Sequence, residues 1–195
     1  MHDRLKLPLR FDPEAMHRDL ERLESDAWID HFVKQNYTGG WSVVPLRASA
    51  TARHPVMMIY SDPSCKEFVD TPLLIRCPYF QEVLATFRCD LEAVRLMKLT
   101  PGSVIKEHRD HDLSYEEGRV RMHVPVKTNP LVEFILNGRR VMLEEGDCWY
   151  LQLSEPHRVS NLGASDRIHL VIDALVNDWV RDLFHAAASG QPQAQ

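Results

Sequence analysis

From residue 91 onward the chain reads as a series of short strands separated by turns, and this pattern limits the fold more than any other feature. The dipeptide Asn137-Gly138 lies between two of these segments and is typical of a type I′ β-hairpin. Many short strands joined by tight turns predict a mainly β protein, built as a sandwich or jelly roll over residues 91–175. The expected strands cover Val94–Leu99, Val120–Thr128, Leu131–Leu136, Arg139–Leu143, Cys148–Leu153 and Ile168–Ala174.

The first ninety residues are expected to be mainly helical. Asp12 is a suitable N-cap and Pro13 suits the first helical position, and apolar residues then recur at helical spacing. Two more helices are expected over 27–34 and 78–87, with a strand at 41–46 between them. A C-terminal helix is predicted over 176–188 and a disordered tail over 189–195. Because the sequence contains no internal repeat and no low-complexity linker, residues 1–195 are expected to form a single domain.

The composition argues against several classes of partner. The net charge of −5 comes with lysine and arginine scattered among the acidic residues, so no basic patch indicates a nucleic acid or an anionic membrane. No apolar run is long enough to span a bilayer, and residues 1–9 lack the apolar core of a secretory signal. The four cysteines form no CxxC pair, which predicts reduced thiols rather than a zinc cluster. We therefore expect a cytoplasmic protein, whose oligomeric state the sequence does not specify.

His108, Asp110 and His157 form the most informative chemical pattern. Residues two apart on a strand point to the same side, so His108 and Asp110 can hold one metal ion together. His157 follows 47 residues after Asp110 and is the candidate for the third ligand. Two histidines and one carboxylate on one face of a metal are the ligands of a mononuclear Fe(II) centre, which keeps other coordination positions open. The alternative is that these are surface histidines and an aspartate in a turn.

Arg167 opens an apolar strand ten residues after His157. A buried arginine without a partner is costly, so we expect Arg167 to bind an anion beside the metal, the alternative being a structural salt bridge to a protein carboxylate. Arg121 and His123 share one face of another strand, whose opposite face is entirely apolar. That pair must therefore face a cavity or the solvent.

Two more arginines and one loop are weaker candidates. Arg95 is expected to point inward, where the carboxylate of a substrate can pair with it. Arg109 lies between two of the metal-ligand candidates and is a second possible contact for the substrate. Residues 111–118 are polar, end in glycine, and are a candidate lid beside the metal. For each of these the alternative is a solvated loop or a surface charge.

The same residues carry a resemblance to a known family. The motifs are HRD at 108–110, RxH at 121–123, EGDCWYL at 145–151, and PHRVSN at 156–161 followed by RIHLVID at 167–173. Together they resemble the aspartyl/asparaginyl β-hydroxylase family of Fe(II)/2-oxoglutarate oxygenases, which includes bacterial cis-proline hydroxylases. A fainter likeness extends to YTGGWSVVPL at 37–46. The resemblance implies a cupin-like double-stranded β-helix with helices packed outside it.

The resemblance also implies cofactors and roles for residues. The cofactors are Fe(II), the co-substrate 2-oxoglutarate and O₂, with His108, Asp110 and His157 as metal ligands. Arg167 would hold the distal carboxylate of 2-oxoglutarate by two parallel hydrogen bonds, and Arg121 and His123 would help to bind the co-substrate.

Two departures from the animal aspartyl hydroxylases place the chain nearer the bacterial amino-acid hydroxylases. The animal enzymes carry a serine at the place of Met97 and lack a carboxylate ligand, whereas this chain has Asp110. Related iron halogenases replace that carboxylate with a small residue, so Asp110 also argues against halogenation.

The sequence thus predicts an Fe(II)/2-oxoglutarate-dependent dioxygenase that hydroxylates a C–H bond. The expected substrate is an amino acid, or an amino-acid residue of the Asp, Asn or Pro type in a peptide or small intermediate. One alternative is a non-catalytic cupin-like module that binds small molecules, and another is a metal-dependent hydrolase on the same scaffold. The identity of the substrate and the stereochemistry of the reaction do not follow from the sequence.

Overall fold

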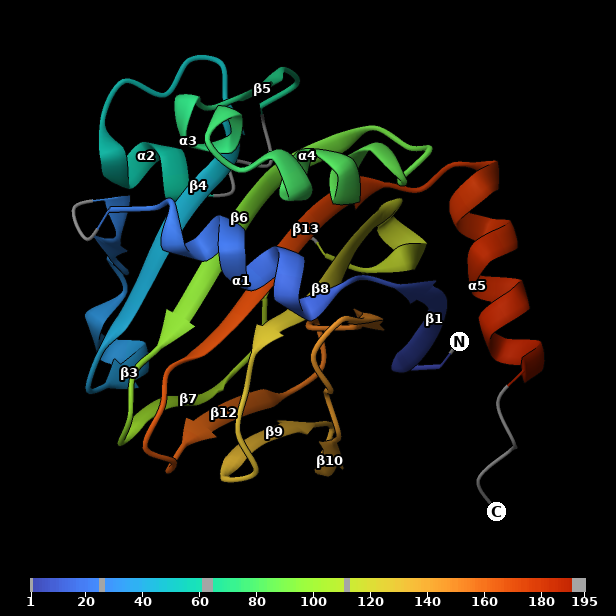
Figure 1. Ribbon diagram of the computed structural model, residues 1–195. Helices are drawn as coiled ribbons and strands as arrows, with labels where there is room; N and C mark the ends of the chain where they lie inside the picture. The colour runs from blue at the N-terminus through green and yellow to red at the C-terminus, as the bar shows by residue number, and fades with distance from the viewer. Residues whose placement is uncertain (1, 25–26, 61–64, 111–112, 191–195) are drawn as a thin grey trace.

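The computed structural model describes residues 2–24, 27–60, 65–110 and 113–190. Its strands form two antiparallel sheets (Figure 1), which together make the expected jelly roll. Within the described residues, the larger sheet contains, in order, β1 (Arg4–Arg10), β11 (Asp147–Leu151), β8 (Arg119–Lys127), β13 (Arg167–Leu175), β6 (Leu91–Leu99), β4 (Trp41–Ser49) and β2 (Ile29–Asp30), with β5 (Phe68–Asp70) paired to β4. The smaller sheet contains β10 (Arg139–Val141), β9 (Val132–Leu136), β12 (His157–Asn161), β7 (Ser103–His108) and β3 (Tyr37–Thr38).

Alternation along the central strands gives the larger sheet one apolar face and one polar face. On β8, Val120, Met122, Val124 and Val126 are fully buried in the main hydrophobic core, as the sequence predicts. Successive side chains on a strand point to opposite faces, so the other residues of β8 face the smaller sheet. Across β6, β8 and β13, this alternation places six buried polar side chains on that inner face: Arg95, Arg121, His123, Arg167, His169 and Asp173.

Four helices pack on the apolar face of the larger sheet (Figure 1): α1 (Pro13–Glu21), α3 (Pro72–Ile75), α4 (Pro78–Ala85) and α5 (Asp178–Gly190). The short helix α2 (Pro55–Ile59) instead contacts the inner face, where the Ile59 carbonyl accepts a hydrogen bond from Arg95. Two 3₁₀ turns, η2 (Lys34–Asn36) and η3 (Tyr115–Glu117), complete the helical elements of the described residues. Asp12 caps α1 as expected, because its carboxylate accepts a hydrogen bond from the Glu14 N–H at 3.0 Å. None of the helices in the described part of the chain is long and apolar enough to cross a bilayer.

A second, smaller core lies between the two sheets. It contains Tyr37, Trp41, Leu99, Ile105, Phe134, Leu136, Val141, Leu151, Leu153 and Val159. The hairpin joining β9 to β10 turns at Asn137 and Gly138, whose φ angles are 48° and 71°. Positive φ at both positions is what a type I′ turn requires, so this part of the prediction is confirmed.

The N-terminal ninety residues differ from the expected, mainly helical arrangement. Residues 4–10 form β1 as an edge strand on β11, with Leu5 and Leu7 buried and Lys6 between them exposed. The helix predicted over 27–34 is wrong: this segment contributes β2 and then the start of η2. Pairing of Ile29 with Val43 on β4 prevails there over local helical spacing. The helices over 78–87 and 176–188 are confirmed within a few residues as α4 and α5.

Within residues 91–175, β7 and β12 were not anticipated. β7 and β12 pair with each other in the smaller sheet. Residues 189 and 190 complete α5 rather than starting a tail, and the remainder of the predicted disordered tail lies outside the described residues.

Candidate active site

The three candidate metal ligands come together where β7 ends and β12 begins. His108 and His157 are direct partners in the β7–β12 ladder, and their ring centroids lie 4.2 Å apart. Asp110 follows the end of β7, where its N–H donates to the Leu153 carbonyl at 2.8 Å and fixes the backbone. The potential ligand atoms of His108, Asp110 and His157 all lie within 4.8 Å of one another. Among the described residues, this is the one group of three such side chains close enough to share a metal ion.

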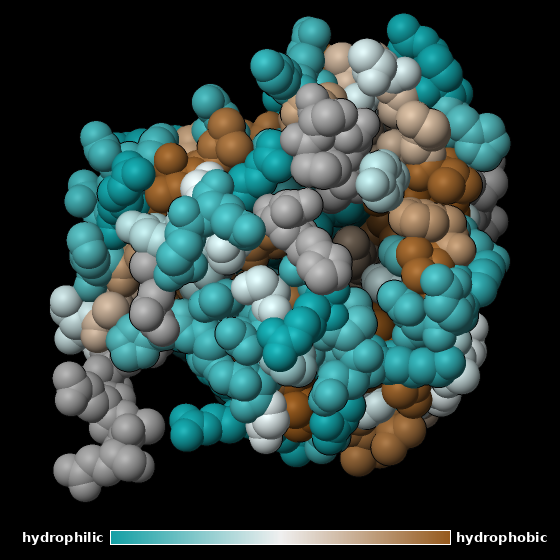
Figure 2. Space-filling model, turned by 180° about the vertical axis from the view of Figure 1, so that it is seen from behind, coloured by the Kyte–Doolittle hydropathy of each residue, from teal (hydrophilic) through white to brown (hydrophobic). Residues whose placement is uncertain are grey.

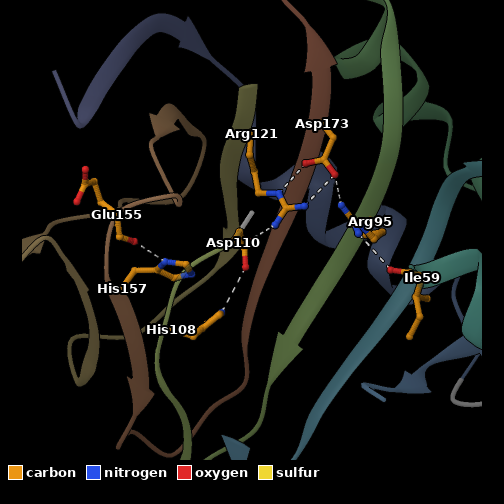
Figure 3. A network of polar contacts seen from close by, with 8 residues as sticks. All are labelled: Ile59, Arg95, His108, Asp110, Arg121, Glu155, His157 and Asp173. Carbon is orange, nitrogen blue, oxygen red and sulfur yellow. Dashed lines mark hydrogen bonds and ion pairs between the residues drawn. The ribbon is translucent and has the colours of Figure 1, made fainter. Parts of the chain in front are cut away.

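Backbone carbonyls set the tautomers of both histidines. The Nδ1–H of His108 donates to the Lys106 carbonyl at 2.8 Å. The Nδ1–H of His157 donates to the Glu155 carbonyl at 3.1 Å (Figure 3). A carbonyl can only accept, so Nδ1 carries the proton and Nε2 keeps its lone pair. Burial lowers the pKa of His157, which favours the neutral ring that a metal requires.

Asp110 is oriented by a buried network of charges (Figure 3). Arg121 donates to one oxygen of Asp110 at 2.5 Å and reaches both oxygens of Asp173, at 2.6 and 2.9 Å. Arg95 forms an ion pair with the same Asp173 and donates to the Ile59 carbonyl at 3.1 Å. Burial acts to lower the pKa of Arg121, but the two carboxylates outweigh it and raise that pKa above the ordinary value. One oxygen of Asp110 is thereby held by Arg121, and the other lies 3.5 Å from His108 Nε2 on the metal side.

Arg167 is buried beside this site without an anionic partner. Its side chain is 3% exposed, and one of its terminal nitrogens lies 2.9 Å from His169 Nδ1. The Phe134 ring lies 5.9 Å from the guanidinium carbon. In the described part of the chain no carboxylate pairs with Arg167, and its Nε has no hydrogen-bond partner. Burial lowers the pKa of Arg167 to about 9, which means that its charged form is desolvated, and an anion that enters the site would stabilise that charge.

Two further histidines complete this end of the site. His123 Nδ1 lies 3.4 Å from His169 Nδ1, and both rings are fully buried. Burial, followed by the charge of Arg167, holds the pKa of each far below the ordinary value, so both are neutral. The Nε2 atoms of both lack partners among the described residues. His169 was not predicted as a site residue; its only signal in the sequence is that it shares a strand face with Arg167.

One cavity of about 380 Å³ brings together the predicted site residues. Its lining includes the three metal-ligand candidates together with Arg95, Arg109, Arg121, His123 and Arg167. Figure 2, seen from behind Figure 1, shows a hollow in the surface with hydrophobic residues along one edge. Arg109 lies at the edge of the cavity, since its side chain is half-exposed and donates to the Ser154 carbonyl at 2.9 Å. A larger groove of about 730 Å³ lies elsewhere and includes none of these residues.

The predicted lid and the cysteines lie at or beyond the margin of this site. Residues 111–112 of the candidate lid lie outside the described residues, while Leu113 is buried and lines the cavity, so lid motion stays a prediction. All four cysteines are free, and burial raises the pKa of Cys77 to about 12 and that of Cys89 to about 11. Thiols of this kind are unreactive.

The sequence matches one protein family over most of its length. The family model described as Aspartyl/Asparaginyl beta-hydroxylase matches residues 11–176. The L-proline cis-4-hydroxylase of Rhizobium meliloti (strain 1021) is 25% identical over 172 residues, covering 85% of this chain and 58% of that protein. The L-proline cis-3-hydroxylase 1 of Streptomyces sp is 23% identical over 171 residues, covering 85% of this chain and 57% of that protein. The chain thus spans less than two thirds of the length of these curated relatives.

Solved structures agree on the fold. An oxidoreductase of the 2OG-Fe(II) oxygenase family from Burkholderia pseudomallei superposes with a TM-score of 0.55 at 15% identity, covering 90% of this chain and 86% of that one. A Pseudomonas putida prolyl-4-hydroxylase also gives a TM-score of 0.55, at 12% identity, covering 91% of this chain and 94% of that one. These likenesses support the jelly roll, and the sequence match defines the family. The chain belongs to the aspartyl/asparaginyl β-hydroxylase family.

Proposed function

We propose that this protein is an Fe(II)/2-oxoglutarate-dependent dioxygenase that hydroxylates a C–H bond of an amino acid, or of an amino-acid residue in a peptide or small intermediate. One observation carries the proposal: a cluster of two histidines and one aspartate shares a cavity with a buried arginine that has no anionic partner among the described residues. A metal position beside a buried arginine suits a co-substrate that binds the metal at one end and carries a second, distant carboxylate.

The donor set fits Fe(II). His108 and His157 offer neutral Nε2 atoms, Asp110 offers one carboxylate oxygen, and the set leaves room for other ligands. With 2-oxoglutarate and O₂, bound Fe(II) supplies the oxidising power for C–H hydroxylation, and the co-substrate is released as succinate and CO₂. Arg121 holds the second oxygen of Asp110 and so keeps the carboxylate turned toward the metal.

The residues around Arg167 fit the distal carboxylate of 2-oxoglutarate. The Nε–H of Arg167 is a buried donor without an acceptor in the part of the chain that the structure describes, and an incoming carboxylate would accept from it. His169 Nδ1 accepts from the guanidinium and holds it in place. His123 lies within the same cavity and has an Nε2 without a partner.

The substrate class rests on the relatives and on Arg95. Both relatives are named as proline cis-hydroxylases, which supports an amino-acid type of substrate. Arg95 lines the cavity and is buried, and its Nε has no partner among the described residues, which suits the carboxylate of such a substrate. A metal-dependent hydrolase is less well supported, because Asp110 is the one carboxylate among the described lining residues and cannot act both as ligand and as general base.

The test is formation of succinate from 2-oxoglutarate by the purified chain with Fe(II) and O₂, with and without each amino acid. We expect turnover that requires Fe(II) and rises with a substrate. The matched controls are Asp110→Ala, which removes a ligand, and Arg158→Ala, which removes an exposed arginine next to His157 that makes no contact with the cavity. A non-catalytic binding module would bind 2-oxoglutarate and form no succinate.

A further inference from the structure

The described residues that line the cavity offer many hydrogen-bond donors and few acceptors. Three of them have buried N–H groups without a partner among the described residues: Trp41, Arg95 and Arg167. Asp110 is the one carboxylate in this lining, and it is shared between Arg121 and the metal position. A ligand of this cavity should therefore bring acceptors and few donors.

The charges around the cavity also favour a ligand that is negatively charged. Three buried arginines, Arg95, Arg121 and Arg167, face two carboxylates, Asp110 and Asp173, which leaves one positive charge. An Fe(II) ion and a 2-oxoglutarate dianion cancel each other. A substrate with one negative charge would balance the remaining positive charge, whereas a zwitterionic amino acid, which has no net charge, would not. Arg109 does not change this count, because it is half-exposed and pairs with Glu155.

An aromatic rim, defined here as His31, Phe32, Trp41 and Tyr60, lines one side of the cavity. His31 stacks on Trp41 with ring centroids 3.6 Å apart and on Phe32 at 4.9 Å, and Tyr60 meets Phe32 edge-on at 5.9 Å. Phe32 and Tyr60 are 40% and 47% exposed, so their ring surfaces are available to a ligand.

The two ring nitrogens of this rim that are left for a ligand, His31 Nε2 and Trp41 Nε1, are both donors. Val33 N–H donates to His31 Nδ1 at 3.3 Å, so the ring proton of His31 lies on Nε2. Burial, then the charge of Arg95, lowers the pKa of His31 to about 4, and the ring is neutral at physiological pH. The indole N–H of Trp41 is the other donor.

We propose that the substrate is an N-acylated α-amino acid rather than a free one, an inference that rests on the proposed function. Its carboxylate pairs with Arg95, its acyl carbonyl accepts from the Trp41 indole N–H, and its acyl group lies against Phe32 and Tyr60. A free ammonium group would bring a positive charge and extra donors into a lining whose one carboxylate among the described residues, Asp110, already faces Arg121 and the metal position, and such burial is strongly unfavourable. Acylation removes that charge and adds an acceptor.

The experiment compares each proteinogenic amino acid with its N-acetyl derivative on the full chain. Binding to the anaerobic protein holding Fe(II) and 2-oxoglutarate is followed by the change in the visible absorption of the metal complex, and turnover is followed by succinate. We expect at least one N-acetyl acid to bind about 100-fold more tightly than its free counterpart, since burial of an unpaired ionic group is rejected by factors of this size or larger. The carboxamide of that N-acetyl acid should bind poorly, because it lacks the charge that Arg95 pairs with.

Variants at two tryptophans test the assigned contact. Trp41→Phe keeps a ring on His31 and removes the N–H, so the preference for the acetylated compound should fall about tenfold while 2-oxoglutarate binding is kept. Trp149→Phe is the matched control, because its indole N–H is also buried without a partner but lies outside this cavity. It should leave the preference unchanged.

The outcomes separate this inference from the proposed function. If free amino acids bind or turn over as well as their acetylated forms, or if no acetylated acid binds while 2-oxoglutarate does, the inference is overturned and the proposed function stands. If 2-oxoglutarate itself neither binds nor turns over, the proposed function falls and the inference falls with it.

Discussion

Substitution of Arg167 by alanine tests how the protein would hold 2-oxoglutarate. The side chain is 3% exposed, and its nearest polar neighbour is neutral His169 at 2.9 Å. Truncation would remove a charge-assisted, two-pronged contact to a desolvated carboxylate. Loss of such a contact costs about 2–5 kcal/mol, which corresponds to a KM for 2-oxoglutarate raised by roughly 30-fold to several thousand-fold. Arg167→Lys should recover only part of this loss, because an ammonium group cannot form the two parallel hydrogen bonds that a guanidinium forms with a carboxylate.

The stability of the same variant separates a role in binding from a role in folding. Arg167 pairs with no carboxylate in the described part of the chain, so its removal leaves no buried carboxylate without its partner. We expect the Tm of the ligand-free protein to change little, and the stabilisation by 2-oxoglutarate to disappear. In the native protein that stabilisation reaches about 2.7 kcal/mol at a ligand concentration of 100 Kd. An unchanged KM, with thermal stabilisation by 2-oxoglutarate retained, would refute the assignment and show that Arg167 is structural.

Four further predictions follow from the site and its supports. Asp110→Ala and His157→Ala should each abolish Fe(II) binding in a metal titration and leave the circular dichroism spectrum native; wild-type affinity in either variant would remove that residue from the ligand set. Asp173→Asn leaves two buried arginines short of a charge, so urea unfolding should show a loss of about 3–5 kcal/mol, and a loss below 1 kcal/mol would contradict the buried network. The pKa of His31 is lowered to about 4 in the folded state, so the unfolded chain binds more protons below pH 6.5. The free energy of unfolding should therefore fall as the pH drops from 6.5 to 4, and His31→Phe should remove up to about 2 kcal/mol of that fall, after allowance for solvent screening; equal pH profiles would show that the imidazole is not desolvated. Reactions of the native protein in chloride or bromide should give no halogenated product by mass spectrometry, because the carboxylate occupies the position that a halide needs.

Five strands of the larger sheet, β4, β6, β8, β11 and β13, were predictable because they carry several apolar residues. β8 is the clearest case, with four fully buried aliphatic side chains on one face and Arg121 and His123 on the other. β7 and β12 were missed because their sequences, SVIKEH and HRVSN, contain few apolar residues. These are the strands of the smaller sheet that carry the two histidines, so the polar residues that define the site also hide its strands from a pattern based on hydrophobicity.

The contacts between site residues were less predictable than the residues themselves. The pairing of Arg121 with Asp173 joins positions 52 residues apart and depends on the β8–β13 register, in which the two lie directly opposite. That register follows from the whole sheet rather than from either strand. His31 was not recognised for a related reason, because its place on Trp41 requires β2 to pair with β4, in a segment that reads locally as a helix. By contrast, β1 could have been predicted from the sequence, because its leucines recur at every second position.

The most direct test of the account is an anaerobic titration of the purified chain with Fe(II) and then 2-oxoglutarate, followed by visible absorption. A 2-oxo acid that chelates Fe(II) through its keto and carboxylate oxygens absorbs in the visible, and this signal needs neither substrate nor O₂. We predict a saturable band with one Fe(II) per chain, absent in His157→Ala and shifted to much higher 2-oxoglutarate concentration in Arg167→Ala. Absence of the band from the native protein, or a band that both variants retain at native affinity, would contradict the proposal that this cavity holds the metal and its co-substrate.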